Sequence, residues 1–582
     1  MKLKKLFTIV LAGLITFTSL GALGGCSKEK SLKELYGNKT FLQVGVYDGG
    51  IGVEWVEKIA AEFEKRYEGV KLEGEDSENE GLKIVVNKSK SYTTGIDQIL
   101  ENEERNVFFC GGVDYKSFIN KGLLMDITDV VTGDLSAVSL GAETGTIENK
   151  LYGKSNSFVN YGGKYYAIPF YSSDGGITYD RGLFLEKGFF FREEPLVEEV
   201  VVAGRPMTIT HEFTNDPALF SVGPDGVRGT YDDGLPSSHE EFYKLCNYIY
   251  TNGCEPLIFT NEYKFYYNYA ALGAFTNSLT ADQLNAYYTY DSGATTVDIV
   301  TGFNGNEPNV QAKTINSTNQ YDLTQSYAKY LAVKFSEGLA TGGNGNYLSK
   351  HCANRLDHLK TQSEFVYSAL KGGSTAPIAM MIEGTYWYGE AKGYGVFKRT
   401  VETYKEKAEN RNFAFMPLPW KETGRVEEGE GKPLTLNNAP GNYAFINNNI
   451  KDNELLTRLA KEFVQFVYTE WGLKTFTQTA NIRMAVDYTM EDSDMTNMDA
   501  FGKSIMVAAR EAQMAYPTKD CAFYMDHQSA LGFGVDTNFW KSQTHNSYLM
   551  ITQFRDKDVS AKDFFLGLKY DSQKWNDLIV GK

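Results

Sequence analysis

The chain has 582 residues, 42% of them hydrophobic, and a formal net charge of −16. This length predicts several domains or one large two-lobed body with ample core. The acidic balance argues against nucleic acid or an anionic membrane surface as a partner, and it suits solubility and neutral or cationic ligands. The 38 tyrosines and 6 tryptophans exceed the needs of core packing. Such rings suit the apolar faces and hydroxyl rims of sugars, although composition alone favours tyrosines on a large polar surface.

The N-terminus predicts an export signal. Lysines precede an uncharged, mostly apolar run over 6–23, for which a transmembrane helix is the alternative because the run is borderline for a span. The run ends in "LGGCSKEKS", with small residues directly before Cys26. This ending resembles the lipobox of bacterial lipoproteins, whose cysteine is acylated and whose leader is cut before it. We therefore expect a lipoprotein signal peptide over 1–25 and a tether over 26–40, held to the membrane only by its lipid.

The first part of the mature chain predicts alternating strands and helices. Residues 41–46 form a buried strand, and 55–63 form a helix with apolar residues at 3.6-residue spacing. The stretch "GVKLEGE", 69–75, starts a second predicted strand, and "VFFCGG", 107–112, ends a third after another helix. This β-loop-α-β order opens a doubly wound sheet.

The same alternation continues to the C-terminus. "YYAIPFY" predicts a short strand and a proline-broken crossing, followed by the strand "GGITYD". Helices are predicted at 237–253, 324–340 and 454–480, and strands at 376–384, 412–419 and 442–449. Two regions, 190–235 and 274–320, are expected to be insertions built from loops and small hairpins. The chain is therefore α/β, with no internal repeat.

The cysteines carry no recognisable framework. Those beyond Cys26 stand at irregular spacing, which is neither a disulfide pattern nor a Cys-x-x-Cys metal site. Cys246 and Cys254 could pair in an oxidising compartment, and buried free thiols are the blander alternative.

Several sequence motifs occur in an order that is typical of one protein family. They are "EWVEKIAAEFEKRYEGVKLE", "INKGLLMDITDVV", "GKYYAIPFY" with "GGITYDRGLFLEKGF", "LPSSHEEFYKLCNYI", "IAMMIEGTYWYGEAK", "FAFMPLP", and the late helix and terminal helix regions. Over about 41–580 this order resembles the extracellular solute-binding proteins of ABC importers, in the carbohydrate-binding group (family 1) that includes maltose-binding protein. The chain departs from that pattern at Ser238, where Thr is usual, and in its two insertions.

The resemblance implies an α/β, two-lobed periplasmic-binding-protein-like fold of type II. Each lobe would be a mostly parallel sheet flanked by helices, with a hinge between the lobes. The first lobe would comprise 41–165 plus 434–485, and the second 166–433 plus 486–582. The implied protein is a monomer without a required cofactor, lipid-anchored at the extracytoplasmic face of the bacterial cell membrane. It would capture a sugar or oligosaccharide and deliver it to ABC transporter permease subunits.

Ligands in such sheets lie beyond the carboxyl ends of the strands, so loops at strand ends supply the candidate binding residues. A sugar site needs aromatic planes together with carboxylate, hydroxyl or amide partners. The candidates are Asp48, Tyr171, Ser172, Asp174, Glu383, Tyr386, Trp387, Trp420, Tyr443 and Arg483. Trp387 is the foremost of them, with core packing as its alternative, whereas Asp48, Asp174 and Glu383 have helix caps or surface charge as theirs.

Two other functions stay open at this stage. A glycoside hydrolase would need two carboxyl groups placed about 5 Å or 6.5–9.5 Å apart, and nothing in the sequence marks such an acid and base. Gly-x-Ser-x-Gly, His-Glu-x-x-His and P-loop motifs are absent from the sequence, so we expect no catalysis. The remaining alternative keeps the transport role with a peptide or another non-sugar solute as ligand.

The stretch "GPDGVRGTYDDG", 223–234, combines glycines with Asp225, Asp232 and Asp233. It lacks the Gly-Lys-Ser/Thr ending of a phosphate loop, and its carboxylates would repel an anion. The carboxylates are hard oxygen ligands, so a structural calcium ion is one hypothesis, although EF-hand spacing is absent. A solvated loop that orders the insertion before the following helix is the other. We do not expect it to contact the sugar.

Overall fold

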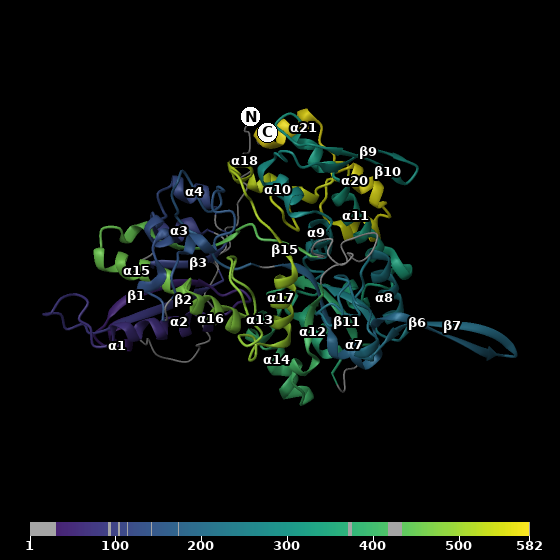
Figure 1. Ribbon diagram of the computed structural model, residues 1–582, viewed down its shortest axis with the longest axis horizontal. Helices are drawn as coiled ribbons and strands as arrows, with labels where there is room; N and C mark the ends of the chain where they lie inside the picture. Colours follow the sequence, from purple (N-terminus) through teal and green to yellow (C-terminus); the bar gives the residue numbers. More distant parts are fainter. Residues whose placement is uncertain are drawn as a thin grey trace, which may run out of the picture.

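The computed structural model describes residues 31–90, 95–102, 105–112, 114–140, 143–172, 174–370, 375–416 and 434–580. Two lobes lie side by side, with α17 (Ala500–Glu511) and α13 (Trp387–Gly393) between them in the view of Figure 1. The signal peptide, Cys26 and Trp420 fall outside the described residues, so lipidation and a role for Trp420 stay predictions. Within the described part of the chain, no helix is long and apolar enough to cross a membrane.

The first lobe is built on a five-stranded sheet in the order β2-β1-β3-β14-β4. Its strands are β1 (Thr40–Tyr47), β2 (Leu82–Ser89), β3 (Val107–Gly111), β14 (Asn442–Ile446) and β4 (Ile168–Pro169). Helices α2 (Glu54–Glu64), α15 (Glu454–Val467) and α16 (Glu470–Ala480) pack with it. Trp55 is fully buried within 5.3 Å of the Phe109, Phe170 and Phe476 ring centroids, as expected for the apolar face of the first helix.

The expected strand over 69–75 is wrong. Gly69 and Gly74 adopt φ angles of 74° and 110°, so this segment turns instead of extending, and β2 begins only at Leu82. The glycines in "GVKLEGE" allow left-handed backbone that a strand does not use.

The second lobe is built on a four-stranded sheet in the order β12-β5-β11-β8. Its strands are β5 (Gly175–Asp180), β8 (Glu255–Phe259), β11 (Ile378–Gly384) and β12 (Phe413–Met416). In each sheet one strand, β14 or β5, runs antiparallel to its neighbours while the other strands share one direction. Both reversed strands follow directly on segments that cross between the lobes, and therefore enter their sheets from the hinge side.

Helices surround the second sheet and complete both lobes (Figure 1). Those of the second lobe include α7 (Arg181–Lys187), α8 (His239–Thr251), α9 (Asn268–Asn277), α11 (Tyr327–Thr341), α12 (His358–Ser368), α13 (Trp387–Gly393), α14 (Val396–Arg399), α17 (Ala500–Glu511), α18 (Ala522–Asp526), α19 (Gln528–Leu531), α20 (Ala561–Leu566) and α21 (Ser572–Val580). Short helices of the first lobe are α1 (Leu32–Tyr36), α3 (Ile96–Asn102), α4 (Tyr115–Asn120), α5 (Thr128–Thr132) and α6 (Ile147–Lys150).

Backbone hydrogen bonds tie three crossing segments together at the hinge. The amide of Phe170 donates to the Asn442 carbonyl, that of Ser172 to the Arg483 carbonyl and that of Ala485 to the Phe170 carbonyl, at 2.9–3.1 Å. Nearby, β13 (Thr435–Asn437) pairs in parallel with β15 (Gln513–Ala515). These contacts bring residues near 170, 440 and 484 together, although they are far apart in the chain.

Both insertions contain the expected hairpins. The first forms β6 (Phe190–Val202) and β7 (Arg205–Thr214), which project from the second lobe (Figure 1). The second contains α10 (Ala281–Thr289) and the hairpin β9 (Val297–Asn304) with β10 (Glu307–Lys313). The projecting hairpin exposes apolar side chains such as Val197 and Val201.

Five cysteines of the described chain are buried free thiols: Cys110, Cys246, Cys254, Cys352 and Cys521. Cys246 and Cys254 thus do not pair in this structure.

Candidate functional site

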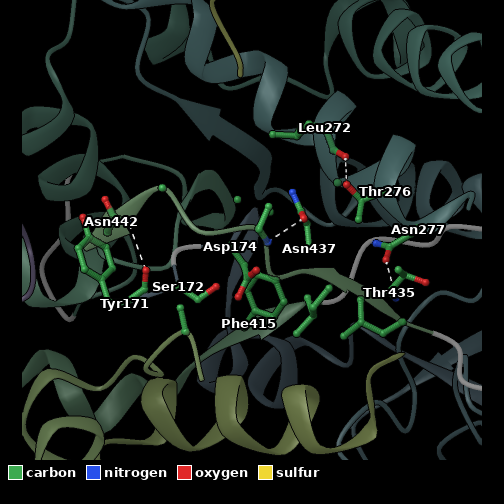
Figure 2. A pocket seen from close by; sticks show the side chains of 18 residues that line it. Tyr171, Ser172, Asp174, Leu272, Thr276, Asn277, Phe415, Thr435, Asn437 and Asn442 are labelled. Carbon is green, nitrogen blue, oxygen red and sulfur yellow. Dashed lines mark hydrogen bonds between the residues drawn. The ribbon is translucent and has the colours of Figure 1, made fainter. Parts of the chain in front are cut away.

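A cavity of about 240 Å³ lies at the hinge, between the crossing segments and α9. Figure 2 shows that its wall carries the amides Asn277, Asn437 and Asn442 together with Asp174. Backbone groups orient these amides. Asn442 Nδ2 donates to the Tyr171 carbonyl at 3.1 Å, and the Asn277 Oδ1 accepts from the Thr435 amide at 3.1 Å. Each of these side chains keeps hydrogen-bonding capacity for a ligand, because an amide offers both donors and acceptors.

The predicted residues Tyr171, Ser172 and Asp174 line this cavity. The Asp174 backbone is held by Thr385, whose amide donates to the Asp174 carbonyl at 2.9 Å. The Asp174 Oδ2 lies 3.5 Å from Nε of Arg483. Arg483 is buried, and its Nη1 donates to Asn438 Oδ1 at 2.7 Å. Arg483 therefore stands behind Asp174 and compensates its charge instead of forming this part of the wall.

A group of five tyrosines, here termed the tyrosine cluster, continues from the cavity into the interface between the lobes. Its members are Tyr47, Tyr171, Tyr266, Tyr269 and Tyr386. The Tyr269 and Tyr386 hydroxyls lie 3.2 Å apart, and the Tyr266 and Tyr269 ring centroids 5.5 Å apart. A Cβ at Gly175, which lines the cavity, would come within 2.2 Å of the Tyr269 ring, so only glycine allows this approach. Burial raises the pKa of Tyr171, and the nearby Tyr47 and Tyr269 raise it further.

Glu383 lies beside the cluster, at the end of β11 and directly opposite Gly176 of β5. Only 2% of its surface is exposed. Its Oε1 accepts a hydrogen bond from the Gly384 amide at 3.0 Å, whereas its Oε2 is buried without a hydrogen-bond partner in the structure. Burial raises the pKa of Glu383 well above its usual range. A hydrogen bond with Tyr386 opposes this rise, and Glu383 is not among the residues that line the hinge cavity.

The first loop of the first lobe reaches across to the second lobe. The Tyr394 hydroxyl donates to the Asp48 carbonyl at 3.0 Å, and a Cβ at Gly389 would come within 1.8 Å of the Gly50 carbonyl oxygen. The Asp48 carboxylate itself lies 3.7 Å from Lys88 Nζ, away from the hinge cavity. Asp48 therefore contributes to the contact between the lobes through its backbone.

Two predicted binding residues belong to the core instead. Trp387 is fully buried at the start of α13, 5.4 Å from the ring centroids of both Phe413 and Phe501. Tyr443 is 1% exposed, stacks on Tyr115 and donates its hydroxyl to the Phe158 carbonyl at 3.1 Å. The two adjacent aromatic residues after β11 therefore point in different directions. Tyr386 belongs to the tyrosine cluster, and Trp387 packs in the core of the second lobe.

The loop 223–234 uses its carboxylates on its own backbone and hydroxyl groups. Asp232 Oδ2 accepts from the Asp225 amide at 3.1 Å, Asp232 Oδ1 from Thr230 at 2.8 Å, and Asp233 Oδ2 from the Gly229 amide at 2.8 Å. Burial and the neighbouring Asp225 raise the pKa of Asp232 to about 7. No group of three or more His, Cys, Asp or Glu placed to hold a metal occurs within the described residues. The calcium hypothesis therefore stays a prediction.

Sequence reasoning missed Tyr47, Tyr266 and Tyr269, as well as the amides of the hinge cavity. The segment "YKFYYNY", 263–269, carried a usable signal, because aromatic residues there are too dense for one face of a helix. The amides carried none, since their meeting depends on how the crossing segments pair.

No family model matches the sequence, and no curated protein matches it. Among solved structures, the chain is similar to the cyclic alpha-maltosyl-1,6-maltose binding protein from Arthrobacter globiformis, with 11% identity, a TM-score of 0.50 and coverage of 94% of this chain and 100% of that one. It is also similar to RafE from Streptococcus pneumoniae in its apo form (12% identity, TM-score 0.48, 93% and 98% covered). A chitin oligosaccharide binding protein gives 12% identity and a TM-score of 0.47 over 92% and 100% of the two chains.

The protein has a type II periplasmic-binding-protein fold. The match to the Arthrobacter globiformis structure, together with the two sheets and the crossing segments between them, confirms the expected fold class. In this fold the hinge cavity and the tyrosine cluster lie where the two lobes meet.

Proposed function

We propose that this protein is a lipid-anchored, extracytoplasmic substrate-binding protein that captures a sugar or oligosaccharide between its lobes and delivers it to an ABC permease. The observation that carries the proposal is the site between the lobes, where amides, Ser172, Asp174 and Tyr171 line a hinge cavity and the other members of the tyrosine cluster lie beside it. Sugar hydroxyls both donate and accept hydrogen bonds, and their C–H faces pack on aromatic rings, so this wall suits them. The similar Arthrobacter globiformis structure is of a saccharide-binding protein, which supports the same reading.

Movement of the lobes about the hinge would allow the protein to enclose its ligand. Three crossing segments hold the lobes together, while the contact of Tyr394 with the Asp48 carbonyl lies between the lobes away from the hinge cavity. Closing the lobes on a ligand would exclude water from the tyrosine cluster and strengthen its hydrogen bonds. The proposed lipid on Cys26 would keep the loaded protein near its permease.

Calorimetric titration of the mature chain, residues 26–582, against mono- and oligosaccharides tests the proposal. We expect binding that weakens about tenfold in Tyr269→Phe, which removes the hydroxyl facing Tyr386 and about 1.4 kcal/mol of hydrogen bonding. Tyr250→Phe is the matched control, because Tyr250 is 45% exposed on α8. Binding of peptides but of no saccharide would contradict the sugar ligand. Release of shorter products from an oligosaccharide would contradict a role in binding alone.

A further inference from the structure

The hairpin of β6 and β7 leaves the second lobe with its base packed and its tip free. Phe190 and Phe191 are buried where it joins the body, whereas every residue over 194–211 except the half-buried Val200 is exposed. Val201, at 73%, is the most exposed large apolar side chain of the residues that the structure describes. Five others on the hairpin are at least 37% exposed: Leu196, Val197, Val202, Met207 and Ile209. The second lobe does not cover these side chains, so they are available to a partner outside the fold.

Apolar side chains lie on both faces of the hairpin near its tip. Paired residues of an antiparallel ribbon share one face, and successive pairs alternate between the faces. Val200 pairs with Met207, and the next pair, Val201 with Pro206, therefore lies on the opposite face. A protein partner with a flat surface would cover one face only. Apolar residues on both faces suit a medium that surrounds the tip, as the outer layer of a lipid bilayer does.

The turn at the tip carries no polar side chain. Ala203 and Gly204 connect the two strands with φ angles of 51° and 77°. Two-residue turns with positive φ at both central positions favour Asn-Gly, because asparagine adopts left-handed backbone more readily than alanine does. Alanine therefore costs stability at this position, and it keeps the end of the hairpin apolar.

The charge at the tip suits a phospholipid surface. Arg205 is the only charged residue over 200–210, and an arginine binds phosphate oxygens well. The carboxylate of Glu199 stands three residues before Val202, the strand partner of Arg205, which is about 10 Å along the strand. That separation exceeds the Debye length of about 8 Å at physiological ionic strength, so the acid is largely screened from the arginine. The net charge of −16 opposes contact between the body and an anionic surface, but the hairpin holds its tip away from the body (Figure 1).

We propose that the tip of this hairpin, residues 200–207, inserts into the surface of the phospholipid bilayer, with Arg205 at the headgroup phosphates. The strand length over 200–202 is about 10 Å, which matches the depth of about 5–10 Å that interfacial segments reach. Figure 1 shows α1, the first described element after the proposed lipid on Cys26, at the opposite end of the long axis from the hairpin. Contacts at both ends would hold the protein lengthwise along the membrane. The sequence predicts attachment through the lipid alone, so this contact goes beyond the proposed function.

Sedimentation of the mature chain with phospholipid vesicles tests the contact. The chain carries Cys26→Ser so that no lipid contributes, and the vesicles contain phosphatidylcholine with or without phosphatidylglycerol. We expect binding that Val201→Glu weakens at least tenfold, because the most exposed apolar side chain becomes a carboxylate. Arg205→Gln should weaken binding to the phosphatidylglycerol vesicles about fivefold, the contribution of one cation near an anionic surface. Val310→Glu is the matched control and should bind as the wild type does, because Val310 is 43% exposed on the other hairpin.

Three results would overturn the proposal. The first is no binding of the wild type to either kind of vesicle, and the second is equal binding by the wild type and Val201→Glu. The third is a wild-type dimer that Val201→Glu dissociates, since the tip would then meet a second copy of the chain. Replacing 195–210 by an Asn-Gly turn should also abolish vesicle binding, which guards against misfolding of a single variant. Saccharide titration of these variants should match the wild type, so a failure to bind sugar would count against the proposed function alone.

Discussion

The buried Lys329 provides a test of how burial changes the pKa of a lysine and the stability of the protein. It lies on α11, is 3% exposed, and donates from Nζ to the Phe539 carbonyl at 2.7 Å. Its ammonium lies 3.7 Å from the Phe539 ring centroid. Burial without an acidic partner lowers its pKa from 10.5 to about 7. We predict that Lys329→Met stabilises the protein at neutral pH.

The size of the expected stabilisation follows from the shift in the Lys329 pKa. A fall from 10.5 to about 7 corresponds to about 5 kcal/mol of destabilisation below pH 7. Methionine removes that cost but leaves the Phe539 carbonyl without its donor, at about 1–3 kcal/mol, and loses the cation–π contact. The expected net gain at pH 7 is about 2 kcal/mol in the free energy of unfolding.

The gain should depend on pH with a defined sign. Because folding lowers the pKa of Lys329, the unfolded chain binds more protons than the folded chain between pH 7 and 10.5, so the wild type gains stability as pH rises through that window. The variant lacks this term, and its advantage should shrink by about 3 kcal/mol between pH 7 and pH 9.5. Urea unfolding of the wild type and of Lys329→Met at several pH values measures this change in the difference between their free energies of unfolding.

Lys334→Met is the matched control, because Lys334 is an exposed lysine on the same helix. A Lys329→Met variant that is less stable than the wild type at pH 7 would refute the reasoning. So would a difference in stability that does not change between pH 7 and pH 9.5.

Three further outcomes test other parts of the structure. Trp387→Ala should cost about 3–5 kcal/mol of stability in urea unfolding because it empties a fully buried ring site; a cost below 1 kcal/mol would place Trp387 outside the core. Replacing 195–210 by an Asn-Gly turn should move the melting temperature by no more than about 2 °C, since the hairpin projects from the body, and a larger fall would show that it supports the lobe. Under the calcium hypothesis for the loop 223–234, a chelator lowers the melting temperature and calcium restores it, and an unchanged value removes the hypothesis.

The sequence by itself determined the local elements and part of the site. Apolar spacing placed the helix over 55–63, and short apolar runs placed β1, β3 and β11, because these patterns depend on neighbours in the chain. The proline-broken crossing predicted that Tyr171, Ser172 and Asp174 lie near the hinge, where they line the cavity, because a strand-end loop at a lobe crossing lies close to it.

Only the tertiary structure decided which side chains face the site. Trp387 and Tyr386 are adjacent in sequence, yet contacts with Phe413 and Phe501 draw one into the core while Tyr269 holds the other at the lobe interface. The pairing of Asp174 with Arg483 has the same origin. The two residues come from different crossing segments, and no spacing in the sequence records that these segments meet at the hinge.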